Sequence, residues 1–203
     1  TSPRLAAGIR RSRPDPQNEW NYSNYGFAVL GYLAEQRTGL SYAHLLEERI
    51  LAPAGMHDAA VDRWTVQDVA PPLSRSGRNA NAFQFDAMAP AGAVRGTIED
   101  AAAFLSAALG ACETDEPLGR ALCETFVPQR GEGEWPYEMG LGWFRSDAGG
   151  ATVVWHNGGT AGSSSFLGFA EESGVGLAVL SNVAGLREID GLGLSFLSEV
   201  EAR

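Results

Sequence analysis

Apolar residues in the first half of the chain recur at the spacing of amphipathic helices. The first such run contains Phe27, Leu30, Leu33 and Ala34. Gly39 provides a stop signal after it, and Ser41 can cap a second helix that ends before Pro53. We therefore predict two helices between residues 24 and 52.

Two further helices are predicted before residue 130. Thr97 with Asp100 resembles a capping box, although the usual acidic partner is Glu or Gln. The helix that they open stops at Gly110. Pro117 suits the first turn of the next helix, because a first-turn residue needs no backbone N–H.

Two segments lack a periodic pattern. Residues 1–19 are rich in Arg and Pro and are predicted to form a loop or an arm. Residues 58–95 are irregular and contain many small or polar residues. A structureless connection of that length inside a domain is usually functional or flexible.

Short apolar runs typical of strands begin at Met139. Gly149-Gly150 marks a turn, and strand-like runs follow around residues 151–156, 164–170 and 175–181. Their spacing predicts an antiparallel meander. A final amphipathic helix carries Ile189, Leu192, Phe196, Leu197 and Val200.

Helices followed by a meander indicate an α+β fold. We predict a mainly helical lobe over about residues 20–135, and antiparallel strands with a C-terminal helix over about residues 139–203. Both belong to one domain over residues 1–203, since no clear linker separates them.

Composition narrows the possible partners and the possible chemistry. The 203 residues carry a formal net charge of -10, which argues against nucleic acid and anionic membrane surfaces as partners. No apolar run approaches the length of about 18–20 residues that spans a membrane. All 15 basic residues are arginine, so a lysine base or a lysine Schiff base is excluded within these residues.

Cys112 and Cys123 form neither a zinc-binding cluster nor a redox Cys-x-x-Cys motif. One disulfide between them is possible, but we expect two free thiols. Cysteine usage therefore does not indicate whether the protein resides in an oxidising or a reducing compartment. No His-x-x-x-His or His-Glu-x-x-His pattern and no phosphate-binding loop occurs. We expect neither a metal nor another cofactor.

Two short segments could carry chemistry. Tyr22-Ser23-Asn24 precedes a helix, and its first and last side chains can face one cavity if the backbone there is extended. Alternatively, Ser23 or Asn24 only caps the helix. His156-Asn157-Gly158-Gly159-Thr160 ends a strand in a glycine-opened edge that a ligand backbone can approach, or it is a turn with an incidental histidine. Ser163, Ser164 and Ser165 follow, and only some of them can enter the same site, because adjacent strand positions face opposite ways.

The combination is more specific than its parts. Tyr22-Ser23-Asn24, Leu51 to Met56, His156 to Thr160 and Leu180-Ser181-Asn182 together resemble the serine β-lactamase and penicillin-binding-protein superfamily. The nearest branch is that of class C β-lactamases, esterases and D-aminopeptidases. Tyr22-Ser23-Asn24 is similar to the Tyr-x-Asn motif, and His156-Asn157-Gly158 is similar to the Lys-Thr-Gly motif in its His-x-Gly form.

The resemblance implies acyl transfer through a covalent serine ester, on a sheet flanked by helices. Tyr22 would assist proton transfer and His156 would face the leaving group or a carboxylate. Asn24, with Gly158 and Thr160, would bind the substrate, which would be a small ester, amide or β-lactam. The backbone N–H of Gly159 would donate to the oxyanion.

The family's Ser-x-x-Lys motif, which carries the nucleophile, has no counterpart here, because the sequence contains no lysine. A free tyrosine has a pKa near 10, so a tyrosine base needs neighbouring cations. We therefore expect a later portion of such a protein, an incomplete β-lactamase/transpeptidase-like fold that is inactive alone. Without the first strands and the nucleophile helix, an apolar face and a strand edge should lie open to a missing N-terminal segment or a complementing chain.

Three functional hypotheses remain open. The chain is a portion of a serine hydrolase, a non-catalytic binding module that keeps the substrate pocket, or a truncated product without function. The sequence names neither the substrate nor the localisation.

Overall fold

The computed structural model describes residues 3–13, 21–61, 69–129 and 137–201. Its core is a five-stranded antiparallel sheet in the order β1-β2-β3-β4-β5. The strands are β1 (Glu138–Met139), β2 (Phe144–Ala148), β3 (Ala151–Gly159), β4 (Ser164–Ala170) and β5 (Val175–Ser181). The predicted α+β class and antiparallel meander are confirmed, and β1 and β2 add two strands that the sequence pattern did not separate.

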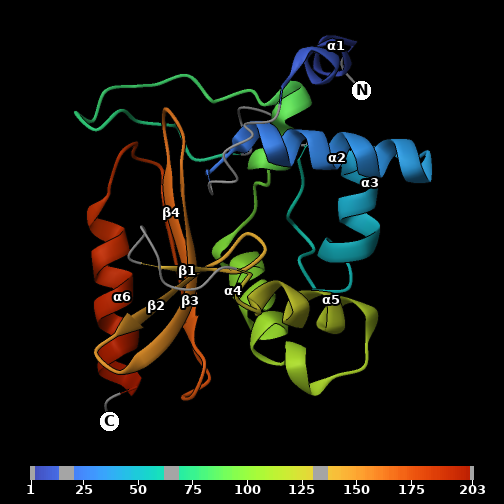
Figure 1. The fold of residues 1–203 in the computed structure, drawn as a ribbon. Helices are drawn as coiled ribbons and strands as arrows, with labels where there is room; N and C mark the ends of the chain where they lie inside the picture. Colours follow the sequence, from blue (N-terminus) through green and yellow to red (C-terminus); the bar gives the residue numbers. More distant parts are fainter. Residues whose placement is uncertain (1–2, 14–20, 62–68, 130–136, 202–203) are drawn as a thin grey trace.

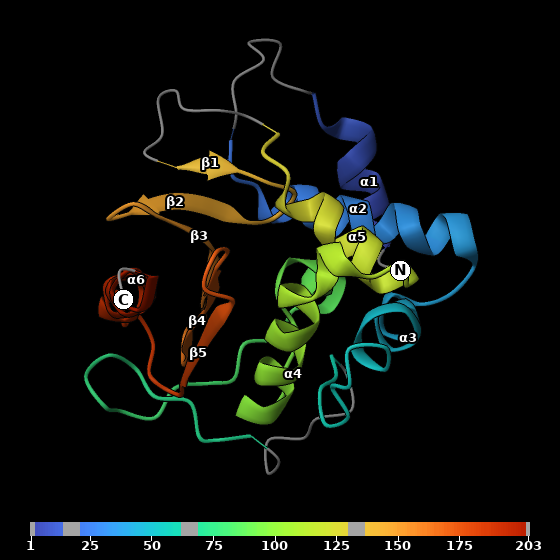
Figure 2. The ribbon, with the colours of Figure 1, turned by 90° about the horizontal axis from the view of Figure 1, so that it is seen from below.

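Helices cover both faces of the sheet (Figures 1 and 2). Along β3, Val153 and Trp155 pack toward α6 (Glu188–Glu201), whereas Val154 packs toward α4 (Ile98–Leu109) and α5 (Pro117–Phe126). This alternation follows from the period of two along a strand. One strand thus contributes to two separate apolar clusters.

The remaining helices form a lobe beyond α4. They are α1 (Pro3–Arg11), α2 (Asn24–Thr38), α3 (Tyr42–Leu46), the π-helical turn η1 (Glu47–Leu51) and the 3₁₀ turns η2 (Asp86–Ala91) and η3 (Ala111–Glu113). Helix α2 crosses η2 closely, because a Cβ on Gly31 would lie 2.1 Å from Cγ of Pro90. The helix predicted over residues 41–52 is observed as α3, which continues directly into the π-helical turn η1.

The predicted capping box of α4 is present. Oγ1 of Thr97 accepts from the Asp100 N–H, and Oδ2 of Asp100 accepts from the Thr97 N–H at 2.8 Å. Asp100 is only 4% exposed, and its Oδ1 also accepts from the Asp58 N–H. The carboxylate therefore joins the start of α4 to a residue 42 positions earlier in the chain.

The prediction for residues 1–19 was wrong in part. Pro3–Arg11 is helix α1, with Leu5 buried and the Ser12 hydroxyl bonded to the Tyr25 hydroxyl at 3.2 Å. Residues 14–20 lie outside the described residues. Contacts with distant residues stabilise a helix that the Arg- and Pro-rich composition conceals.

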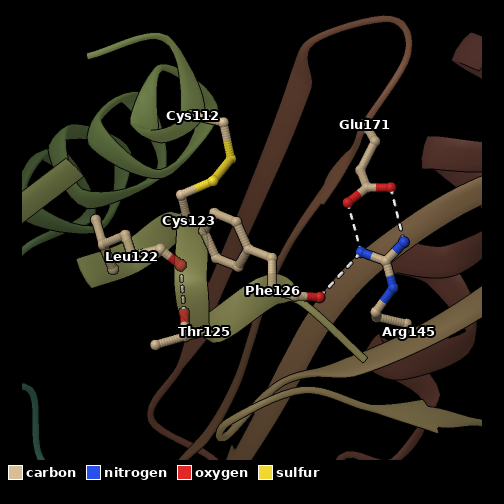
Figure 3. Close-up of a disulfide and its surroundings, with 7 residues drawn as sticks. All are labelled: Cys112, Leu122, Cys123, Thr125, Phe126, Arg145 and Glu171. Carbon is tan, nitrogen blue, oxygen red and sulfur yellow. Dashed lines mark hydrogen bonds and ion pairs between the residues drawn. A yellow bond between two sulfur atoms is a disulfide. The ribbon is translucent and has the colours of Figure 1, made fainter. Parts of the chain in front are cut away.

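The expectation of two free thiols was also wrong. Cys112 and Cys123 form a disulfide with a Cα–Cα distance of 5.0 Å (Figure 3). Residue Cys112 lies in η3, and α5 folds back against η3, which brings the two cysteines together. The packing of two consecutive elements against each other decides this pairing.

The end of α5 is held to the sheet by Arg145 of β2 (Figure 3). Its guanidinium makes a bidentate ion pair with Glu171 and donates to the carbonyl oxygen of Phe126 at 3.3 Å. Glu171 and Glu138 together raise the pKa of Arg145 against the effect of burial, and the largest cause is the hydrogen bonding that Arg145 donates to Glu171. The contact fixes α5 against the sheet.

Candidate active site

A cleft of about 1500 Å³ lies between the end of β3, the start of α2 and the irregular segment before α4. All six residues singled out by sequence line it: Tyr22, Asn24, His156, Gly158, Gly159 and Thr160. Residues more than 130 positions apart in sequence thus share one cavity. Figure 1 shows that the start of α2 lies near one end of the sheet.

The Tyr22-Ser23-Asn24 segment satisfies both of its interpretations. Ser23 is the N-cap of α2 and accepts from the Gly26 N–H at 2.9 Å. Its extended backbone leaves Tyr22 and Asn24 on the cleft wall, and Tyr22 is 43% exposed. The cap therefore orients the two flanking side chains.

His156 is packed between two aromatic rings. Its ring centroid lies 5.1 Å from that of Phe144 and 6.2 Å from that of Tyr22. Its Nδ1 contacts the backbone oxygen of Asn157. A carbonyl oxygen can only accept, so this contact places the proton on Nδ1 and leaves Nε2 as an acceptor in the neutral ring.

The pKa of His156 is lowered from its ordinary value. Burial is the largest cause, while the Asn157 backbone bond and the negative charge of Asp190 act in the opposite direction. The ring is accordingly neutral at pH 7. His156 stands at the first position of the motif that reads Lys-Thr-Gly in its other form. A lysine there would carry a positive charge, whereas the neutral imidazole can only form hydrogen bonds.

The end of β3 has an unpaired edge toward β2. Pairing of β2 with β3 stops at Phe144 opposite Trp155, so within the described residues no strand lies beside residues 156–159 on that side. The Thr160 N–H donates to Ser163 on the other side, at 3.0 Å. Because main-chain groups alternate in direction along a strand, the Gly159 N–H points to the unpaired edge.

The two glycines differ in what surrounds them. A Cβ on Gly158 would lie 2.4 Å from Oγ of Ser165, whereas a Cβ on Gly159 would meet nothing within 4 Å. A side chain at position 158 would therefore require the Ser165 hydroxyl to rotate away. At 159 the free space lies beside the open edge, where a ligand can approach the backbone.

Two of the three serines after β3, Ser163 and Ser164, have side chains that hydrogen-bond to neighbouring segments. Oγ of Ser163 bonds Oγ1 of Thr160 at 2.6 Å. Oγ of Ser164 is buried, donates to the Val183 carbonyl and accepts from the Leu186 N–H. These contacts hold the β3–β4 hairpin and the chain after β5 together.

Sequence reasoning missed the opposite wall of the cleft. Apolar side chains that remain exposed line it: Phe83, Val94, Ile98 and Leu180. Arg95 is also a lining residue, and its guanidinium donates to the Phe83 carbonyl at 2.9 Å. Phe83, Val94 and Arg95 come from the irregular segment, whose pattern carries no signal for a site, whereas Ile98 begins α4 and Leu180 belongs to β5.

The described parts of the chain contain no group of three or more His, Cys, Asp or Glu side chains placed to hold a metal ion. Among the same residues, no helix has both the length and the apolar character needed to cross a membrane.

Known proteins resemble this chain in sequence and fold. Penicillin-binding protein 4* of Bacillus subtilis (strain 168) is 38% identical over 47 residues, which are 23% of this chain and 10% of that protein. A D-stereospecific amidohydrolase from Streptomyces sp. is 27% identical with a TM-score of 0.67, over 83% of this chain and 52% of that one. A beta-lactamase/D-alanine carboxypeptidase from Pseudomonas syringae shares the fold, with a TM-score of 0.84 and 18% identity over 100% of this chain and 66% of that one.

The chain therefore spans between a tenth and about two thirds of the length of these proteins. The model of the Beta-lactamase family matches residues 3–193, which is nearly the whole sequence. The resemblance inferred from the Tyr-x-Asn and His-x-Gly motifs is thereby confirmed, and this chain belongs to the Beta-lactamase family.

Proposed function

We propose that this chain forms the substrate-binding and proton-transfer side of an acyl-transfer site in a serine hydrolase. The observation that carries the proposal is the single cleft shared by Tyr22, Asn24, His156 and the open edge of β3. In this proposal a serine Oγ from sequence beyond these 203 residues attacks the substrate carbonyl. The lysine of the same outside segment supplies the cation that lets Tyr22 accept the serine proton, and Tyr22 then passes this proton to the leaving amine or alcohol. Water later attacks the ester, giving one proton back to the serine Oγ and releasing the acid.

The remaining residues bind and polarise the substrate. The Gly159 N–H donates to the oxyanion, a contact whose loss typically costs about 10²–10³ in kcat. Asn24 holds a substrate amide, and the substrate backbone lies along residues 156–159, as in strand addition. His156 faces the leaving group through a neutral ring, and Thr160 borders the same position.

The size and lining of the cleft support the proposal that a segment outside these residues completes the site. Its volume of about 1500 Å³ exceeds the roughly 300–1,000 Å³ of usual small-molecule pockets. Its walls include large apolar side chains such as Phe104 and Leu46, which commonly pack against other protein. A helix bearing Ser-x-x-Lys would occupy this space, and the chain alone would be inactive.

The substrate class is proposed as small amides or esters of D-configured acids. The 27% identity with a D-stereospecific amidohydrolase supports D-configured amides. β-Lactams remain within the class, since the family includes enzymes that act on them. A neutral histidine in place of lysine favours esters and amides over β-lactams.

The test is intact-mass spectrometry after incubation with a β-lactam and with an activated ester. The 203-residue chain is expected to keep its mass, and a form that also carries the Ser-x-x-Lys segment is expected to gain one acyl group. In that form Tyr22→Phe should slow acylation by about a hundredfold. Tyr25→Phe is the matched control, because Tyr25 bonds Ser12 instead of lining the cleft.

An acyl adduct on the chain alone, at Ser163, Ser164 or Ser165, would show that it contains its own nucleophile. A second candidate function, a binding module without turnover, is favoured by the absence of lysine from the sequence. It requires that the chain alone bind a D-amino-acid amide, and that Asn24→Ala weaken this binding. A third candidate, a truncated product without function, requires neither adduct nor binding in any form.

A further inference from the structure

Asp190 lies in the first turn of α6, on the face of the sheet opposite His156. The Asn157 side chain points to that face, as the alternation along β3 requires, and its Nδ2 donates to Oδ2 of Asp190 at 2.7 Å. The backbone of Asn157 meanwhile forms part of the open edge of β3. One residue therefore separates the carboxylate from the edge along which substrate is proposed to lie.

The charge of Asp190 is not balanced by a cationic side chain among the residues that the structure describes. The five ion pairs found there involve other acids. Its neighbour on α6, Glu188, pairs with Arg75 instead. The Asn157 amide is the side-chain hydrogen-bond donor that the Asp190 carboxylate contacts among the described residues.

No cationic side chain among the described residues forms an ion pair with Asp190. Arg187, whose backbone carbonyl accepts from the Asp190 N–H, has an exposed side chain outside these ion pairs. His156 is neutral at pH 7. Arg95 lines the cleft but directs its guanidinium to the Phe83 carbonyl. The negative charge of Asp190 also reaches the cleft, because it acts on the imidazole of His156.

We propose that Asp190 determines specificity: its charge disfavours a free carboxylate at the β3 end of the cleft and favours an uncharged or cationic substrate group there. This inference rests on the proposed function. It assigns to α6, which supplies none of the lining residues, an effect on which acyl donors and leaving groups the site accepts.

The charge effect can be measured on the chain alone, without turnover. Two nitroxides that differ only in carrying a carboxylate or an ammonium group are added separately at low ionic strength. Their paramagnetic relaxation of the Gly158 and Gly159 amide protons is compared by NMR. The cationic probe should relax these protons more strongly, and Asp190→Asn should reduce the ratio about two- to fivefold.

Glu199→Gln is the matched control. It removes one negative charge from the same helix, nine residues further along, which places it about 13 Å away along the axis. The ratio at Gly158 and Gly159 should hardly change in this variant. Equal changes in both variants, or no change in Asp190→Asn, would overturn the inference. Asp190→Ser is made in parallel, so that a folding defect in one variant does not decide the result.

An active form of the protein provides a second readout. There, Asp190→Asn should raise kcat/KM for a peptide ending in a free carboxylate, relative to the matching amide, by about two- to fivefold. An unchanged ratio in an enzyme that is otherwise active would contradict the inference. Absence of acylation in every form would contradict the proposed function, while the nitroxide measurement would still decide the charge effect.

Discussion

The charge of His156 depends on its packing against Phe144 and Tyr22. Burial lowers its pKa in the folded chain, whereas the unfolded chain keeps a value near 6.5. Above that pH both states are neutral at this position. Below it the unfolded state binds the proton first, so acid destabilises the fold through this residue.

We expect the free energy of unfolding to fall between pH 7.5 and 5.5 by more in the wild type than in His156→Gln. The difference amounts to at most about 1.4 kcal/mol over this range, because pH 5.5 lies only about one unit below the pKa of the unfolded chain. Urea denaturation at several pH values measures it. His44→Gln is the control, since His44 is exposed beside Glu48; equal pH dependence in all three proteins would contradict the assignment.

Asp100 gives a second prediction at the scale of a residue. Burial would raise its pKa, but hydrogen bonds from Thr97, Asp58 and Ala59 outweigh burial and lower it. Asp100→Ala should cost about 2 kcal/mol of unfolding free energy, because it removes a buried charged acceptor and a helix cap. Chemical denaturation at pH 7 measures the loss.

The exposed Asp115 serves as the control for Asp100. Asp115→Ala should change stability by less than about 0.5 kcal/mol. Because the folded pKa of Asp100 is below that of the unfolded chain, its contribution is present above the unfolded value of about 3.9. It is lost as the pH falls through the folded pKa, so wild type and Asp100→Ala should converge in stability in strong acid.

At the scale of elements, the disulfide joins η3 to α5 across 11 positions. Closing a loop of that length stabilises the native state by about 2–3 kcal/mol in the chain-entropy model. The double variant Cys112→Ser/Cys123→Ser should lose about this amount. Urea denaturation with and without reductant measures it.

Reductant should destabilise the wild type and leave the double variant unchanged. A wild-type protein that is insensitive to reductant, or that shows two free thiols by mass spectrometry after alkylation, would contradict the pairing. Arg145 also holds α5 to the sheet, so removing the disulfide should disorder only the part of the chain near Cys112 and Cys123 (Figure 3).

At the scale of the whole molecule, two helices expose apolar side chains on their outer faces. On α2 these include Leu30, which is 60% exposed, and on α6 Leu192, which is 62% exposed. Strand β5 ends the sheet order and has no strand partner on its outer side within the described residues. Such surfaces usually pack against other protein.

The isolated chain should therefore bind a hydrophobic dye such as ANS and associate at micromolar concentration. The double variant Leu30→Gln/Leu192→Gln should reduce both effects. Light scattering after size exclusion measures the association. A chain that is monomeric, compact and without dye binding would count against the expectation that another segment or chain completes the fold.

The sequence by itself determined what depends on neighbours along the chain. The capping box at Thr97 and the first-turn Pro117 predicted two helices correctly, because caps act within one turn. Short apolar runs separated by turns predicted β3, β4 and β5, because the residues that favour a strand lie within the strand itself. The Tyr-x-Asn and His-x-Gly motifs pointed to the family, which is confirmed, and to six candidate residues, whose roles stay predictions.

Only the tertiary structure decided what depends on distant contacts. It placed α1 on the lobe, paired Cys112 with Cys123, and built part of the apolar wall from a segment without periodicity. It also set the neutral state of His156 and joined Asp190 to the back of β3. Burial, long-range pairing and electric fields act across space, so no local pattern in the sequence encodes them.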